Sequence, residues 1–231
     1  MRTVIQYEDE HIIIAYKPAG LATQTAKVGQ PDMVSELKNH LKGGYVGVVH
    51  RLDQPVEGLL VFAKTKPAAA ALSGQLEKGV MNKSYCAVVC GKPECEQGEL
   101  VDYLRKTSDN RTEVVDADQA EAADAKPARL QFEVLAQSEQ ADISLLGIHI
   151  DTGRFHQIRA QLAHAGHPLL GDIKYGTEMS SQISRKYGVR NVALCACELE
   201  CVHPVTGELI HFIVEPQGEI FHCFDWNYEE S

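Results

Sequence analysis

Residues 50–64 of this chain read HRLDQPVEGLLVFAK, a short polar loop that runs directly into an apolar segment. The apolar run 59–63 is short, rich in branched residues and preceded by a Pro/Gly turn signal, which indicates a buried strand. Asp53 lies in the loop, two residues after Arg51, and a nearby arginine keeps a carboxylate ionised, as a nucleophile requires. A rigid strand behind a polar loop is a suitable mount for a catalytic acid. The alternative is an aspartate that only caps backbone amides in a turn.

A second polar cluster lies far along the chain, where residues 153–159 read GRFHQIR and again lead into apolar sequence. Arg154, His156, Gln157 and Arg159 place several hydrogen-bond donors within two helical turns, and arginine forks suit carboxylates and phosphates. Two such clusters, distant in sequence, are the expected form of one active site assembled in space. A solvated helix face is the alternative for this second cluster.

A third candidate is Tyr85, which shares one face of an expected strand with Lys83. Its ring offers a flat surface that suits stacking on a base. A half-buried sheet tyrosine beside an extended lysine is the alternative interpretation.

Composition narrows the class of protein. The chain has 231 residues, 44% of them hydrophobic, and a net charge of −10, which argues against a basic, sequence-independent nucleic-acid coat protein. No run approaches the roughly 18 apolar residues needed to cross a bilayer, and the N-terminus has no apolar signal core, so a cytoplasmic protein without membrane contact is expected. The seven cysteines are scattered, which suggests reduced thiols. Cys195, Cys197, Cys201 and His203 share one strand face but are spaced too widely for one zinc ion, so no metal site is predicted.

Short strands dominate the expected secondary structure, and helices are few. Strands are expected at residues 4–7, 11–16, 59–64, 83–90, 130–135, 144–151, 192–202 and 209–215, and helices at 34–41, 67–78 and 155–165. Residues 104–128 are polar and alanine-rich and are expected to form a surface loop or hairpin. The pattern predicts an α+β fold: a single domain over residues 1–231 with a mixed, largely antiparallel sheet flanked by a few helices and loops.

Taken in order along the chain, these motifs resemble those of the RluA-type pseudouridine synthases, which isomerise uridine to pseudouridine in structured RNA. The resemblance covers nearly the whole chain. It rests on Asp9 and Lys17-Pro18-Ala19-Gly20, His50-Arg51-Leu52-Asp53 with Gly58-Leu59-Leu60, Lys83-Ser84-Tyr85, residues 153–176, and His203-Pro204-Val205-Thr206-Gly207. It implies the pseudouridine synthase fold, no metal or organic cofactor, and no N-terminal S4-like RNA-binding domain.

The resemblance also implies roles for individual residues. Asp53 would attack a flipped-out uridine, Tyr85 would stack on the target base, and Arg159 would pair with Asp53. Substrate binding would fall to the remaining motif residues: Arg51 at the mouth of the site, His50, Lys83, Arg154, His156 and Gln157, and Leu169 and Leu170 on the apolar side. The expected partner is an rRNA or tRNA stem-loop, bound by a monomer.

The chain departs from the family pattern in two places, at residues 56–57 and at residue 155. Val56-Glu57 stands where the family usually has Thr-Ser, and Phe155 stands where it has a small polar residue. A Glu57 side chain pointing toward Asp53 would oppose its ionisation and repel RNA phosphates. These departures keep open a catalytically weak RNA-binding or RNA-folding module on the same fold. A small-molecule hydrolase or glycosidase using Asp53 with Glu57 is a third reading.

Overall fold

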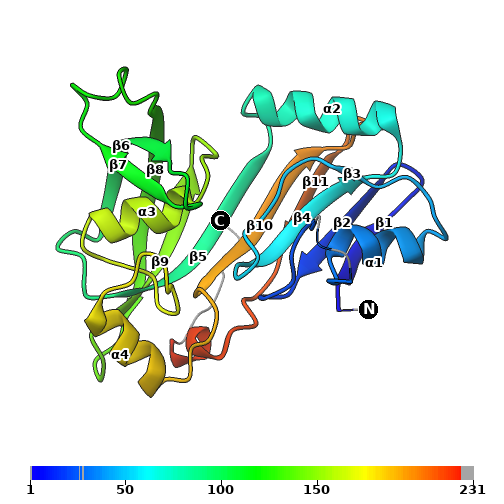
Figure 1. Cartoon of the computed structure of the whole chain (residues 1–231). Helices are drawn as coiled ribbons and strands as arrows, with labels where there is room; N and C mark the ends of the chain where they lie inside the picture. Colours follow the sequence, from blue (N-terminus) through cyan, green and yellow to red (C-terminus); the bar gives the residue numbers. More distant parts are fainter. Residues whose placement is uncertain (1, 26, 28, 225–231) are drawn as a thin grey trace. The chain divides into compact units, whose positions relative to one another are not determined.

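A computed structural model describes residues 2–25, 27 and 29–224. Two units are distinguished within it (Figure 1). Unit 1 holds the described residues up to Ser84 together with Cys195–Gln217, and unit 2 holds Tyr85–Leu194 together with the described residues from Gly218 onward. Strands β5 (Asn82–Cys90) and β10 (Leu194–Val202) each pass from one unit into the other.

The apolar run after Asp53 forms strand β4 (Glu57–Ala63) of unit 1, in which every residue is buried. Within unit 1 the strand order is β1 (Val4–Glu8), β2 (Ile12–Lys17), β4 and β10, with β3 (Gly47–Val48) paired to β4 and β11 (Leu209–Ile213) paired to β10. The β4–β10 pair is parallel and the others are antiparallel. Gly58 is required in this pair, because its φ is +121° and a Cβ there would lie 2.4 Å from the Ala196 carbonyl oxygen.

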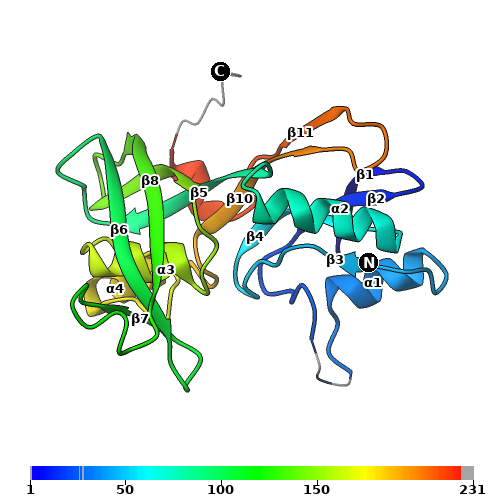
Figure 2. The same cartoon turned by 90° about the horizontal axis from the view of Figure 1, so that it is seen from above.

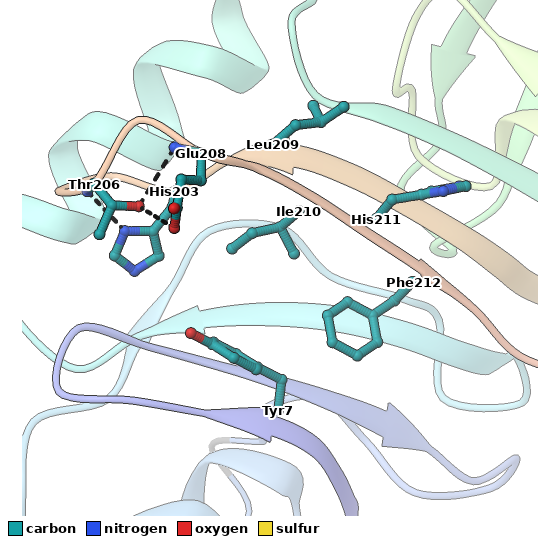
Figure 3. A pocket seen from close by; sticks show the side chains of 8 residues that line it. All are labelled: Tyr7, His203, Thr206, Glu208, Leu209, Ile210, His211 and Phe212. Atoms are coloured by element: carbon teal, nitrogen blue, oxygen red, sulfur yellow. Dashed lines mark hydrogen bonds between the residues drawn. The ribbon is translucent and has the colours of Figure 1, made fainter.

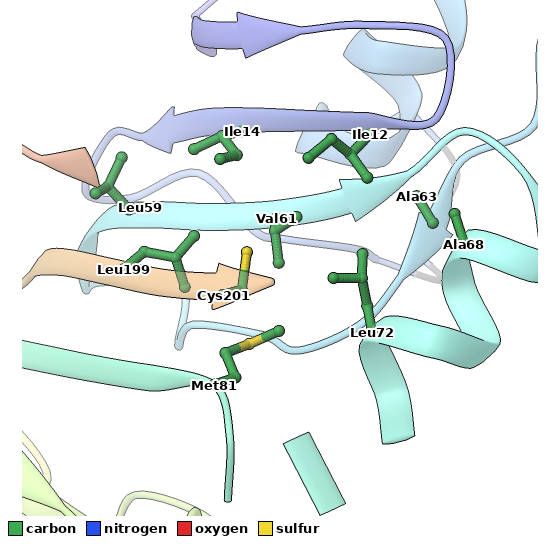
Figure 4. Packing of buried hydrophobic residues seen from close by; sticks show 10 residues of the cluster. All are labelled: Ile12, Ile14, Leu59, Val61, Ala63, Ala68, Leu72, Met81, Leu199 and Cys201. Carbon is green, nitrogen blue, oxygen red and sulfur yellow. The ribbon is translucent and has the colours of Figure 1, made fainter. Parts of the chain in front are cut away.

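The core of unit 1 lies between its strands and helix α2 (Lys66–Glu77), as Figure 4 shows. Ile12 and Ile14 of β2 pack with Val61 of β4 and with Leu72 of α2. Because side chains alternate along a strand, Ile13 belongs to the opposite face of β2, and it is fully buried as well. Strand β2 pairs with β4, the strand that follows the Asp53 loop, so a strand buried on both faces gives this loop a rigid support.

Helix α1 (Met33–His40) and helix α2 each begin at a side-chain cap. Asp32 accepts a hydrogen bond from the Ser35 amide at 2.7 Å, and Thr65 accepts one from the Ala68 amide at 3.2 Å. Gly79 follows the end of α2 with a φ of +67°.

Unit 2 is built on an antiparallel sheet with helix α3 (Gln157–His164) packed against β6 and β7 (Figure 2). Its strand order is β5, β9 (Ile143–Ile150), β8 (Lys126–Gln137), β6 (Gln97–Lys106) and β7 (Thr112–Val115). A small core of Leu104, Ala128 and Ala160 joins the helix to the sheet. Helix α4 (Glu178–Lys186) and a short 3₁₀ helix (Glu219–Cys223) complete the described part.

The predicted α+β class with a mixed, largely antiparallel sheet is confirmed. Residues 104–128 contain the end of β6, all of β7 and the start of β8, so they form a hairpin and not a loop. The helix expected from residue 155 begins at Gln157, because His156 adopts a left-handed conformation that a helix cannot continue. Strand β6 and helix α4 were not predicted. The single domain over residues 1–231 stays a prediction.

In the described part of the chain, no helix combines the length and the apolar character needed to span a bilayer.

Candidate active site

Asp53 lies on a loop of unit 1 that is fastened on both sides of it. On one side, the Thr23 hydroxyl donates to the Leu52 carbonyl at 3.0 Å and accepts from the Leu52 amide at 3.2 Å. On the other, the Gln54 carbonyl accepts from the Gly20 amide at 2.8 Å. The carboxylate itself is only partly buried. The loop therefore presents an accessible acid from a fixed backbone, the property expected of a nucleophile.

The side chain of Lys17 also holds this loop in place, and Lys17 is fully buried. Its ammonium group donates to the carbonyls of Leu21 at 2.6 Å, Gln54 at 3.0 Å and Pro18 at 3.2 Å. Burial lowers the pKa of Lys17 to about 7, although the charges of Asp53 and Glu57 act in the opposite direction. Lys17 thus supplies both a tether and a nearby charge to the Asp53 loop. The sequence signalled the Lys-Pro turn but not the burial of its lysine.

Glu57, the departure from the family pattern, is buried in β4. Its carboxylate accepts a hydrogen bond from the Tyr16 hydroxyl at 2.7 Å. Burial, followed by the neighbouring Cys195 and Glu57, raises the pKa of Tyr16, so this hydroxyl keeps its proton. Glu57 therefore has a partner in strand β2 of its own unit. Whether its charge also acts on Asp53, as considered from the sequence, stays a prediction.

Three other candidates of unit 1 differ in exposure. Arg51 is exposed, whereas His50 is buried and its Nε2 accepts from the Val61 amide at 3.4 Å. Burial, with a smaller contribution from Lys83, lowers the pKa of His50 to about 3. Burial also lowers the pKa of Lys83. The contact with Val61 gives His50 a structural function in this unit, and substrate binding by these residues stays a prediction.

Arg159 of unit 2 forms a buried two-pronged ion pair with Asp172, at 2.7 Å from Nε and 2.8 Å from Nη2. The same carboxylate accepts from the backbone amides of Lys174 at 2.9 Å and Tyr175 at 3.3 Å. The Arg159 guanidinium also lies 5.2 Å from the centroid of the Tyr175 ring. The family motifs predicted Asp53 as the partner of Arg159. They did not predict its contacts with Asp172 and Tyr175, although both residues lie within the motif of residues 153–176.

The 152–157 segment is organised by the buried side chain of Gln157. Its amide oxygen accepts from the Thr152 hydroxyl at 2.8 Å and the Arg154 amide at 3.0 Å, and its nitrogen donates to the Arg129 carbonyl at 3.1 Å. Arg154 is exposed and donates through Nε to the Pro127 carbonyl at 3.0 Å. Gln157 thus shapes the loop that presents Arg154, and its predicted contact with substrate is untested.

The remaining candidates of unit 2 surround strand β5. Tyr85 is buried in β5. Leu169 bridges to Val89 of the same strand, and the Leu170 amide donates to the Val88 carbonyl at 3.0 Å. Both leucines are buried, and their place on the apolar side of the site stays a prediction.

Unit 1 therefore carries Asp53 with Arg51, His50 and Lys83, and unit 2 carries Tyr85 and Arg159 with Arg154, His156, Gln157, Leu169 and Leu170. The assembly of the two sets into one site is a prediction from the motifs.

A pocket of about 320 Å³ lies in unit 1 beside the hairpin of β10 and β11, whose connecting turn is residues 203–208 (Figure 3). It is lined by Tyr7, His203, Thr206, Glu208, Leu209, Ile210, His211 and Phe212, none of which is a predicted site residue. The ring of His203 fixes this region: Nδ1 accepts from the Thr206 amide at 2.9 Å, so Nε2 carries the proton that is donated to Asp9 at 2.7 Å. The hairpin motif is thus structural in this unit.

The cysteines and histidines of the described residues form no group of three or more potential metal ligands with Asp or Glu. Cys195, Cys197 and Cys201 are buried thiols that form no disulfide.

A sequence model described as RNA pseudouridylate synthase matches residues 11–164. The uncharacterized RNA pseudouridine synthase YhcT of Bacillus subtilis is 36% identical over 211 residues, which cover 89% of this chain and 66% of that protein. The dual-specificity RNA pseudouridine synthase RluA of Vibrio parahaemolyticus is 34% identical over 237 residues, covering 96% of this chain and 89% of that protein. Human RNA pseudouridylate synthase domain containing 1 shares the fold, with a TM-score of 0.77 at 20% identity over 93% of this chain and 83% of that one.

The chain belongs to the RNA pseudouridylate synthase family. The prediction of an RluA-type RNA pseudouridine synthase, an isomerase, is confirmed by these relatives. The chain spans about two-thirds of the length of YhcT, 66%. No finding favours the alternative of a catalytically weak binding module.

Proposed function

We propose that this chain isomerises a uridine of structured rRNA or tRNA, with Asp53 as the nucleophile. The observation that carries the proposal is the Asp53 loop: a partly exposed carboxylate on a backbone fastened by Thr23, Gly20 and buried Lys17. Such a fixed acid meets the requirement of nucleophilic catalysis for an oriented attacking group.

The reaction exchanges one glycosidic bond for another. The target base first leaves its stack, which costs a few kcal/mol. Attack by Asp53, on the sugar or on the base, allows the N1–C1′ bond of uridine to break. The base then turns, its C5 bonds to C1′, and the proton on C5 passes to solvent while N1 is protonated. The isomerisation is balanced without any oxidant or reductant.

Arg159 and Tyr85 complete the proposed site from unit 2. Arg159 is held by Asp172 in unit 2, and the family motifs assign to its guanidinium the pairing with Asp53 in the proposed site. Tyr85 lies on β5 and supplies the ring for stacking on the target base. Arg51 and Arg154 are exposed and suit contacts with phosphates.

An RNA substrate follows from the family, and its class is proposed from relatives whose names specify a large ribosomal subunit RNA or a tRNA. The single catalytic domain, the monomeric state and the cytoplasmic location remain proposals.

The test is release of tritium from RNA labelled at uridine C5. Total RNA from cells lacking the gene is incubated with the wild-type chain, with Asp53→Asn and with Glu77→Gln, which alters an exposed carboxylate of the same unit. We expect release by the wild type and by Glu77→Gln, and loss of at least about 10³-fold in Asp53→Asn. Equal release by Asp53→Asn would disprove the role of Asp53, and no release by folded wild type from any RNA class would disprove the activity.

A further inference from the structure

Phe155 is a large aromatic side chain that remains 37% exposed at the entrance to helix α3. Its ring is stacked on that of His156, with centroids 3.8 Å apart and planes inclined by 22°. It lies in the same cluster as Arg154 and Arg159, yet neither the proposed chemistry nor the core of unit 2 uses it. An exposed ring in such a position requires an explanation.

The backbone that presents Phe155 is strained and then fastened. His156 adopts φ 52° and ψ 26°, a left-handed conformation that is unfavourable for a non-glycine residue. The Thr112 hydroxyl donates to the Phe155 carbonyl, and the Thr112 amide donates to the Tyr175 hydroxyl at 2.6 Å. The Tyr175 hydroxyl in turn bonds His156 Nδ1 at 2.8 Å. These contacts fix the Phe155–His156 stack in place.

A cation lies on this ring. The Lys106 ammonium is 4.6 Å from the Phe155 centroid, and since the imidazole occupies one face of the ring, Lys106 occupies the other. Among the described residues, no carboxylate lies within ion-pair distance of Lys106, Arg154 or Lys174. An acidic chain thus keeps the Lys106 ammonium, without an ion-pair partner among the described residues, on one exposed aromatic ring.

We propose that Phe155 is a stacking platform for a base of the substrate RNA other than the target uridine. The base takes the face that Lys106 covers, and the flexible lysine moves from the ring to the phosphate of the same nucleotide. An aromatic ring beside a mobile cation is the combination that binds single-stranded nucleotides. A nucleotide suits this site because it offers both a flat base for the ring and a phosphate for the Lys106 ammonium. This proposal rests on the proposed function, since it assumes an RNA substrate.

The test separates binding from turnover. Initial rates of tritium release are measured against the concentration of the same labelled total RNA for wild type, Phe155→Leu, Phe155→Tyr and Leu135→Ala. Phe155→Leu keeps apolar volume but removes the ring, Phe155→Tyr keeps the ring, and Leu135 is a control that is 38% exposed. We expect Phe155→Leu to raise KM about tenfold with little change in kcat, and Phe155→Tyr and Leu135→Ala to match the wild type.

A second measurement does not depend on turnover. Irradiation at 254 nm of the wild-type chain with the same RNA, followed by mass spectrometry, should place a nucleotide adduct on the peptide containing Phe155. An unchanged KM in Phe155→Leu, or no adduct on this peptide while other peptides are cross-linked, would overturn the platform. If the wild type releases no tritium but forms the adduct, the platform holds and the proposed activity fails.

Discussion

Lys17 in unit 1 and Arg159 in unit 2 are both buried cations at the predicted catalytic motifs, but they are held by different partners. Lys17 donates only to neutral carbonyls, whereas Arg159 has the full charge of Asp172 opposite its fork. The lysine consequently has a pKa of about 7, lowered by burial. The difference teaches that the Asp53 loop is held by a lysine near its titration point, whereas residues 153–176 are held by an ion pair of Arg159 with Asp172. Four experiments test this comparison, ordered by the expected size of the change in unfolding free energy.

The largest effect is expected from Asp172→Ala. It removes the carboxylate from a guanidinium whose side chain is only 4% exposed, and breaking a buried pair by deleting one partner costs about 3–5 kcal/mol. Urea unfolding followed by circular dichroism measures the loss. The double variant Arg159→Met/Asp172→Leu, which buries no charge, should recover part of the stability but no activity. A loss below about 1 kcal/mol in Asp172→Ala would show that the pair does not fasten this region.

The next largest effect is a pH dependence caused by Lys17. Below pH 7 both folded and unfolded chains hold its proton; above pH 7 the folded chain releases it, whereas the unfolded lysine keeps it up to its ordinary pKa of 10.5. Stability therefore rises with pH, by about 2 kcal/mol between pH 7 and pH 9. Urea unfolding at pH 7, 8 and 9 should show a rise in the wild type that is smaller by about this amount in Lys17→Met, in which the lowered pKa of Lys83 still contributes. Above pH 9 the raised pKa of Cys195, due first to burial, acts in the opposite direction. Parallel pH profiles for the two chains would refute the assignment.

Tyr175→Phe should destabilise unit 2 by about 1–2 kcal/mol, because the Thr112 amide and His156 Nδ1 both lose the hydroxyl between them. Thermal unfolding measures the change, and amide hydrogen exchange at Thr112 locates it. Tyr187→Phe, on the C-cap of α4, removes a hydroxyl for which no hydrogen bond is found in the described residues, and serves as control. Unaltered exchange at Thr112 would contradict the prediction.

The smallest loss of stability, about 1 kcal/mol, is expected from Thr23→Val, which keeps the shape but removes both bonds to Leu52. Because the Asp53 loop is loosened, kcat for tritium release should fall about tenfold or more. Thr65→Val removes the cap of α2 at a similar cost in stability but should leave kcat unchanged. Equal kcat values for Thr23→Val and Thr65→Val would show that the rigidity of the Asp53 loop does not contribute to turnover.

Local patterns predicted much of this structure. The apolar run after Asp53 indicated strand β4. Asp32 is a cap residue type at the start of α1, and Gly79 is a common helix-ending residue after α2. These features could be read from the sequence because they depend on neighbours within a few residues. Burial of Lys17 and pairing of Arg159 with Asp172 were missed, since both depend on segments brought together by folding. Helix α4 escaped because its face is mainly polar, with Ser180 and Ser184 as its buried residues. The proposed role of Phe155 had no signal in the sequence other than the departure of this residue from the family pattern.

The division of the chain has a consequence for the order of events during synthesis. Unit 1 needs Cys195–Gln217, and the bond from His203 to Asp9 joins residues 194 positions apart. The ribosome takes roughly 5 to 20 seconds to make the intervening residues 85–194. The Asp53 loop is therefore translated early, but the sheet of unit 1 stays without β10 and β11 until almost the whole chain has emerged. During that interval the apolar faces of β2 and β4 are candidates for chaperone binding.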